Sequence, residues 1–137
     1  MNLNAIHHVA IIVSDYDKSR DFYVNKLGFD IIRENHRPHR HDYKLDLKCG
    51  NIELEIFGNR ISDLEYVAPP KRVGLPEHPR EACGLRHLAF HVEDVNSNKA
   101  ELETMGIYVE PVRTDDYTGK KMTFFFDPDG LPLELHE

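Results

Sequence analysis

Short apolar runs separated by polar turns fill the first part of the chain, and their periodicity predicts one helix among several strands. The run at 6–13 is rich in β-branched residues, as a buried strand is. Ser14 and Asp15 provide a helix start, apolar residues then recur about one turn apart, and Gly28 provides a helix end. A polar loop is expected at 34–42. The expected elements are a strand at 6–13, a helix at 17–27 and strands at 29–33, 43–47 and 51–57.

The same order of elements recurs after position 84. Gly106 ends the second predicted helix, and the Asp-Pro-Asp-Gly sequence at 127–130 predicts a tight turn before the last strand. Both parts of the chain therefore predict the order βαβββ, which is an α+β fold built from two similar modules. The expected elements are a strand at 86–92, a helix at 95–105 and strands at 107–113, 121–126 and 131–136.

Between the two modules lies a segment that fits neither pattern. Four prolines fall within residues 59–84, so we expect module 1 at about 5–58, a connector at about 59–84 and module 2 at about 85–137. A connector of this length without regular structure suggests a crossover or a functional loop. A module of roughly 55 residues buries little apolar surface alone. We therefore expect the two modules to share a core in a single domain over residues 1–137.

Each module carries one histidine near its start and one glutamate near its end, at the same spacing. His8 and Glu55 are 47 positions apart, and so are His87 and Glu134. Their surroundings match as well, since HHVAIIVSD resembles RHLAFHVED and LEIF resembles LELH. Two imidazoles and two carboxylates brought together form a site for a divalent metal ion. We therefore predict that His8, Glu55, His87 and Glu134 bind one such ion.

The glutamate of the first module has an alternative. Glu53 lies two residues before Glu55 and would share its face of the strand. We prefer Glu55 because it makes the two spacings equal, and Glu53 stays open as the second choice. His91, which shares a strand face with His87, could also reach the site. The histidines of the polar loop, such as His39, are expected to be solvated.

Charge and composition narrow the classes of partner. The net charge of −7 and the pI near 5.7 argue against nucleic acid or an anionic membrane as partner, and no apolar run is long enough to span a bilayer. The first residues lack the pattern of a signal peptide. Cys49 and Cys83 have no framework spacing. We therefore expect a reduced, cytoplasmic protein that acts on a small molecule.

With these motifs the chain resembles the vicinal oxygen chelate superfamily, and within it glyoxalase I and the glyoxalase I-like bacterial proteins. The motifs that carry the resemblance are HHVAIIVSD with the following FYVNKLGF, GLRHLAFHVEDV, FFFDPDG and PLELHE. The resemblance implies that the two βαβββ modules form a cup-shaped, barrel-like mixed sheet with the metal ion between them. The family's ligand positions fall on His8, Glu55, His87 and Glu134, although the family's usual Ile-Glu-Leu context matches Glu53. A homodimer is also implied.

The resemblance further implies a metal-dependent lyase or isomerase of the glyoxalase I type. In that chemistry a proton moves through a metal-bound enediolate, on a 2-oxoaldehyde adduct such as one linked to glutathione, and Glu134 or Glu55 is the base. Nickel, cobalt, zinc, iron and manganese all suit the ligand set. Alternatives within the superfamily are an epimerase, a dioxygenase, a thiol transferase or a non-catalytic binding protein. An anionic thiol carrier would need cations, and the candidates are Arg37, Arg40, Lys44, Lys120 and Lys121.

Overall fold

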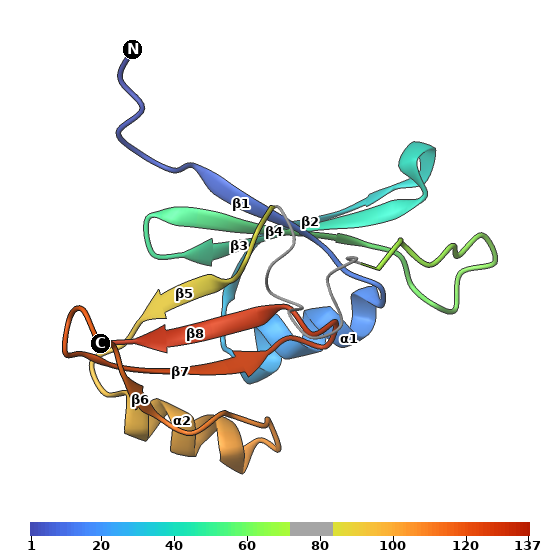
Figure 1. Cartoon of the computed structure of the whole chain (residues 1–137). Coiled ribbons are helices and arrows are strands. Elements are labelled where there is room, and N and C mark those ends of the chain that lie inside the picture. The colour runs from blue at the N-terminus through green and yellow to red at the C-terminus, as the bar shows by residue number, and fades with distance from the viewer. Residues whose placement is uncertain (72–83) are drawn as a thin grey trace. The chain divides into compact units, whose positions relative to one another are not determined.

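The computed structural model describes residues 1–71 and 84–137 and divides the chain into two compact units, Met1–Pro70 and Lys71–Glu137 (Figure 1). Among the described residues, each unit contains one four-stranded mixed sheet and one α-helix, which confirms the predicted α+β class with two modules. The boundary between the units falls within the predicted connector, and residues 72–83 of that connector lie outside the described residues. Sharing of one core by the two modules stays a prediction.

The first unit has the predicted order of elements. Its sheet has the strand order β1-β4-β3-β2, in which β1 is parallel to β4 and the other pairs are antiparallel. The helix α1 continues directly into one π-helical segment, η1, and a short 3₁₀ turn, η2, links β2 to β3. The bounds are β1 His8–Ile12, α1 Tyr16–Arg20, η1 Asp21–Lys26, β2 Asp30–Arg37, η2 Pro38–Arg40, β3 Asp42–Cys49 and β4 Ile52–Gly58.

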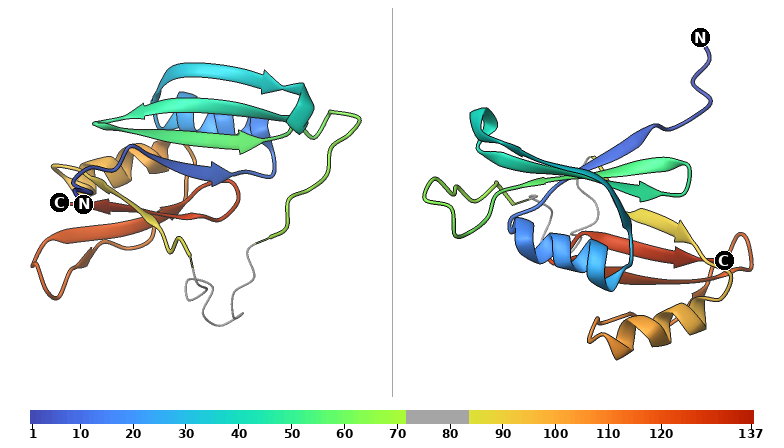
Figure 2. Two further views of the ribbon diagram at one scale, coloured as in Figure 1. Left: turned by 90° about the horizontal axis from the view of Figure 1, so that it is seen from above. Right: turned by 180° about the vertical axis from the view of Figure 1, so that it is seen from behind.

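Local chemistry explains where the first helix starts and which sheet face it covers. The Asp15 carboxylate accepts a hydrogen bond from the backbone N–H of Lys18 and so caps the helix. The helix lies on one face of the sheet (Figure 2). Leu54 and Ile56 of β4 are fully or almost fully buried in the core. Because side chains alternate along a strand, Glu53 and Glu55 project from the opposite face.

The second unit repeats this topology. Its sheet has the order β5-β8-β7-β6, with β5 parallel to β8, and α2 packs on β7 and β8 (Figure 1). Asp94 caps α2 as Asp15 caps α1. In the turn before β8, the Asp127 carboxylate accepts backbone hydrogen bonds from Asp129 and Leu131, as the Asp-Pro-Asp-Gly sequence predicts. The bounds are β5 Leu88–His91, α2 Val95–Thr104, β6 Arg113–Thr114, β7 Lys121–Phe126 and β8 Pro132–His136.

Two predicted boundaries were wrong. The loop expected at 34–42 is mostly strand, because β2 continues to Arg37 and β3 begins at Asp42. Almost every residue of β2 is exposed, so no apolar alternation marks it in the sequence. The strand expected at 107–113 is reduced to an isolated bridge at Val109 and the two-residue β6. Pro111 stands between them and has no N–H to donate.

No helix among the described residues is long and apolar enough to cross a membrane.

Candidate metal centre

His8 and Glu55, here called half-site 1, lie on neighbouring parallel strands of the first unit. The His8 Nε2 atom is 3.7 Å from Glu55 Oε2. Glu55 is only 8% exposed although it is a carboxylate. Its charge is balanced by the Lys44 ammonium, whose Nζ lies 3.0 Å from Glu55 Oε1. The second imidazole nitrogen of His8, Nδ1, lies 2.9 Å from Nδ1 of His7. The two nearest side-chain partners of this glutamate are therefore one imidazole and one ammonium.

His87 and Glu134, here called half-site 2, form the corresponding pair in the second unit. The His87 Nε2 atom lies 2.9 Å from Glu134 Oε2, and Glu134 is 6% exposed. The ring of Phe124 stands edge-on to the His87 imidazole at 5.3 Å between centroids. Each unit thus brings together the histidine and glutamate that the sequence spacing paired. Each half-site also places an imidazole nitrogen beside a nearly buried carboxylate.

Strand register distinguishes Glu55 from Glu53. In the first unit Ala10 pairs with Glu55, and in the second unit Ala89 pairs with Glu134. Each histidine lies two residues before its alanine, so Glu55 and Glu134 occupy equivalent positions. The position equivalent to Glu53 in the second unit is Pro132. Only Glu55 is therefore part of the repeated arrangement, which favours it over Glu53 as the ligand.

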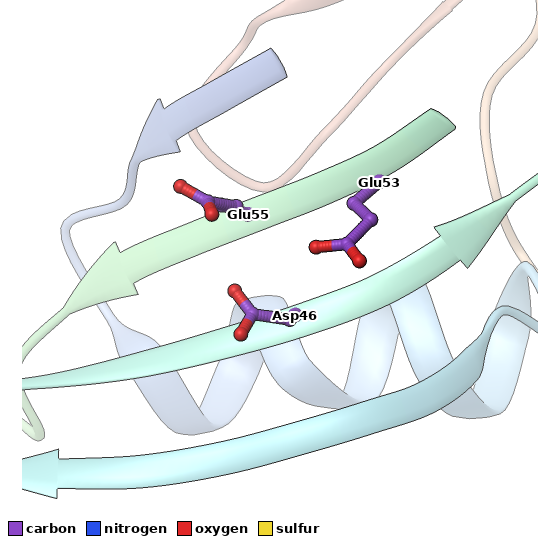
Figure 3. A group of neighbouring side chains, drawn as sticks. All are labelled: Asp46, Glu53 and Glu55. Carbon is purple, nitrogen blue, oxygen red and sulfur yellow. The ribbon is translucent and has the colours of Figure 1, made fainter. Parts of the chain in front are cut away.

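Half-site 1 continues into a cluster of three carboxylates, those of Asp46, Glu53 and Glu55, whose oxygens lie within 4.8 Å of one another. They project from β3 and β4 on one face of the sheet, with α1 behind it (Figure 3). Two cations pair with these three carboxylates and offset part of their charge. Arg33 binds the fully buried Asp46 at 2.6 Å and Glu53 at 3.0 Å, and Lys44 bridges Glu55 and Asp46 at 3.0 and 3.3 Å. The Glu55 carboxylate, and secondly Asp46, raise the pKa of Lys44 above its ordinary value.

The Arg33–Asp46 ion pair has a consequence for stability. Replacing Arg33 by methionine leaves the buried Asp46 carboxylate with Lys44 alone, so we expect the free energy of unfolding to fall by about 2 kcal/mol. The half-exposed guanidinium keeps the loss below that of a fully buried pair. Urea unfolding measures the change. Arg60→Met is the control, because the Arg60–Asp17 pair is exposed on both sides and should contribute less than about 1 kcal/mol. Equal losses in the two variants would contradict this account.

Half-site 2 has a different environment at the equivalent positions. Phe124 pairs with Glu134 as Asp46 pairs with Glu55, and Met122 takes the position of Lys44. At these two positions the second glutamate has apolar neighbours where the first has an acid and a lysine. A cavity of about 450 Å³ opens beside His87 and Glu134 in this unit. His91, the other histidine considered, is not among the residues that line this cavity.

Sequence reasoning missed several side chains around the two half-sites. Asp46 was not considered, and Lys44 was considered only as a contact for substrate. The alternation of β3 could have placed Lys44 and Asp46 on one face, but the register that sets them beside Glu55 comes from strand pairing. Arg37, another candidate contact, is bound by Asp42 at 2.6 Å. Arg86, which lines the cavity in the second unit, was not considered.

Comparisons with known proteins identify the family. Residues 5–135 match the model of the Glyoxalase/Bleomycin resistance protein/Dioxygenase superfamily, and the chain belongs to this superfamily. The chain is 51% identical to the uncharacterized protein YwkD of Bacillus subtilis (strain 168), over 100% of this chain and 99% of YwkD. In structure it is similar to SMU.1112c, with 73% identity, a TM-score of 0.94, and coverage of 99% and 100% of the two chains. It is also similar to a glyoxalase family protein from Enterococcus faecalis, with 56% identity, a TM-score of 0.85 and full coverage of both chains.

More distant relatives are named for different enzymatic activities. The glyoxalase I of Leishmania major is 28% identical, with a TM-score of 0.68 over 98% of this chain and 86% of that one. A 2-epi-5-epi-valiolone epimerase from Actinomyces sp. is 30% identical over 96% of this chain and 78% of the epimerase. Membership of the superfamily therefore leaves the particular reaction to be argued from the residues of this chain.

Proposed function

We propose that His8, Glu55, His87 and Glu134 bind one divalent metal ion, and that the protein is a metal-dependent lyase or isomerase of the glyoxalase I type. The observation that carries this proposal is the repeated pairing of an imidazole with a nearly buried glutamate, in the same register, in both units. One half-site alone offers two ligands, which is fewer than protein metal sites usually have. The proposed metal site therefore requires half-site 1 together with half-site 2. The two half-sites would come from one chain or from the two chains of a homodimer.

The donor set fits a transition metal of intermediate hardness. Two imidazole nitrogens and two carboxylates suit nickel, cobalt, zinc, iron or manganese, and leave coordination positions for water or substrate. When bound, such an ion would polarise the oxygen atoms of a carbonyl substrate and offset the negative charge that develops on them. The carboxylates would compensate the ion's charge, and Glu134 is only 6% exposed.

The different surroundings of the two glutamates suggest different roles. Lys44 holds Glu55 by an ion pair, so Glu55 is suited to stay in place as a ligand. Glu134 has no comparable ammonium among the described residues, and its neighbour across the strand pair is Phe124. We therefore assign Glu134 as the base that takes a proton from the carbon next to a carbonyl and returns it to the adjacent carbon. Glu55 is the alternative base.

The choice between Glu55 and Glu53 as ligand can be tested by metal affinity. Glu55→Gln removes a charged ligand, so we expect the affinity of this variant for Ni²⁺ to fall by at least about tenfold. Mutation of residues that only hydrogen-bond to a metal ligand already lowers metal affinity by about that factor. Glu53→Gln should change the affinity by much less, because Glu53 lies outside the repeated histidine–glutamate arrangement. Isothermal titration calorimetry of both variants measures the difference. A larger loss in the Glu53 variant would reverse the assignment.

The substrate class proposed is a small 2-oxoaldehyde adduct, and the hemithioacetal of methylglyoxal and glutathione is the first to test. The test is the rate of thioester formation by protein loaded with Ni²⁺ or Zn²⁺, compared with protein loaded with neither. Acceleration that requires the metal supports the proposal. Metal binding without turnover would instead favour another proton-transfer reaction of the superfamily, such as the epimerisation named for the Actinomyces relative. The cytoplasmic location and the homodimer remain predictions.

A further inference from the structure

His7, the residue just before β1, makes a direct side-chain contact with the candidate ligand His8. The Nδ1 atoms of the two imidazoles are 2.9 Å apart, and the rings stand nearly perpendicular, at 89° with 5.2 Å between their centroids. The backbone of His7 is fixed against β4, because its carbonyl oxygen accepts the N–H of Glu53 at 3.0 Å. The contact therefore comes from a residue whose backbone is held at the sheet, although both imidazoles are exposed.

A hydrogen bond between two Nδ1 atoms fixes the tautomers of both rings. A neutral imidazole carries one proton, on Nδ1 or on Nε2, so one ring must donate from Nδ1 and the other must accept. If His8 is the donor, its Nε2 atom has a free lone pair. The distance from His8 Nε2 to Glu55 Oε2 is 3.7 Å, which is too long for a hydrogen bond, so Glu55 does not accept a proton from Nε2. The geometry therefore favours the tautomer of His8 with its proton on Nδ1.

This tautomer is the one that a metal ion requires. A histidine that binds a metal ion through Nε2 donates its Nδ1–H to a neighbouring acceptor, and this hydrogen bond fixes the orientation of the ring and makes it a stronger ligand. The acceptor in metal sites is usually a carboxylate, a backbone carbonyl or water. In half-site 1 the group in that place is the Nδ1 atom of His7.

The second module has a different residue at the equivalent position. Arg86 stands directly before His87, and its Nη1 atom lies 3.3 Å from His87 Nδ1. A guanidinium only donates hydrogen bonds, so Arg86 cannot accept a proton from that nitrogen. The Nε2 atom of His87 lies 2.9 Å from Glu134 Oε2, which is within hydrogen-bond distance. The contacts of His87 therefore favour the opposite tautomer, with the proton on Nε2.

We propose that His7 is a positioning residue for the metal site and holds His8 in the tautomer whose Nε2 atom can bind the ion. The His8 Nδ1–H group donates to His7 Nδ1, and the lone pair of His8 Nε2 stays free. This inference rests on the proposed function and adds to it a residue outside the four ligands. It also makes the half-sites unequal. His8 already has the binding tautomer, whereas His87 must first release its Nε2 proton to water and take one up at Nδ1.

Three variants separate the hydrogen bond from the contact between rings. His7→Phe keeps an aromatic ring without an acceptor, so we expect its affinity for Zn²⁺ to fall by about tenfold, the lower end of the range for lost hydrogen-bond partners of metal ligands. His7→Gln keeps an acceptor oxygen and should retain most of the affinity. Arg86→Met is the matched control, because it removes the corresponding side chain of the second module, and it should not weaken binding. Competition with a chromophoric zinc chelator gives the dissociation constants.

The tautomer of His8 can be measured without a metal ion. In protein labelled with ¹⁵N-histidine, nitrogen chemical shifts distinguish protonated from unprotonated ring nitrogens, and the spectrum of His8→Ala identifies the signals of His8. The measurement is made in mildly alkaline, metal-free buffer, in which free imidazoles are neutral. We expect the proton on Nδ1 of His8 in the unaltered protein and in His7→Gln, and loss of this preference in His7→Phe.

Several results would overturn the proposal. They are a proton on Nε2 of His8 in the unaltered protein, unchanged affinity in His7→Phe, an equal loss of affinity in His7→Gln and His7→Phe, and a loss of the same size in Arg86→Met. Failure of the proposed function has a different signature. An unaltered protein that shows the expected tautomer of His8 but binds no Zn²⁺ would contradict the metal site itself, and with it the positioning role of His7.

Discussion

Replacing His87 by alanine is expected to abolish stoichiometric binding of a divalent metal ion. The imidazole Nε2 atom lies 2.9 Å from the Glu134 carboxylate, and these two groups are the whole of half-site 2. Without His87, Glu134 is a single ligand, and half-site 1 contributes two more at most. Loss of partners that only orient a ligand already weakens metal sites by about 10–100-fold, and loss of a ligand itself should cost more. Equilibrium dialysis followed by elemental analysis measures the metal content.

His39→Ala is the matched control for this prediction. His39 is exposed on the 3₁₀ turn after β2 and takes part in neither half-site. We expect this variant to bind as much metal as the unaltered protein, and circular dichroism should show that both variants are folded. If the His39 variant loses the metal while the His87 variant retains it, the ligand assignment is wrong.

Glu134→Gln is expected to reduce turnover far more than metal content. An amide can still act as a weak ligand through its oxygen, but it cannot take up the proton that a general base accepts. General base catalysis typically contributes about 10²–10⁴-fold, so we expect a loss of kcat in that range. The measurements are kcat on the hemithioacetal and metal content of the same preparation.

The comparison variant is Glu55→Gln, because Glu55 occupies the equivalent position in the first unit. Since Lys44 holds Glu55 in place, we expect this variant to lose metal affinity and to lose activity in proportion to it. Full turnover in the Glu134 variant would show that Glu134 is not the base. Glu55 would then become the candidate.

Much of the fold could be predicted because the sequence of each module contains clear local signals for helix starts, turns and strands. The helix start at Asp15 and the turn at Asp127 have short-range chemical signals, and both lie where they were expected. The strands expected at 43–47 and 51–57 were found from their alternation, and the strand expected at 6–13 from its β-branched apolar run. The exposed part of β2 gave no such signal, since alternation marks a strand only when one face is buried.

Only those residues of the candidate site that recur in both modules could be predicted from the sequence. Equal spacing singled out the two histidine–glutamate pairs, and pairing of β1 with β4 and of β5 with β8 brings the members of each pair together. The partners of those pairs depend on long-range strand pairing, which no spacing in the sequence encodes. Lys44 and Asp46 in one unit and Met122 and Phe124 in the other are therefore visible only in the structure. They are also what makes the two otherwise equivalent glutamates different.

The most direct test of the account is the metal content of the purified protein after loading and exhaustive dialysis. The account predicts one divalent ion per chain for the unaltered protein, and none for the His8→Ala and His87→Ala variants, because the site needs both half-sites. Inductively coupled plasma mass spectrometry with protein quantification gives this ratio for nickel, cobalt, zinc, iron and manganese. No retained metal under any loading, or one ion per chain retained in both histidine variants, would contradict it.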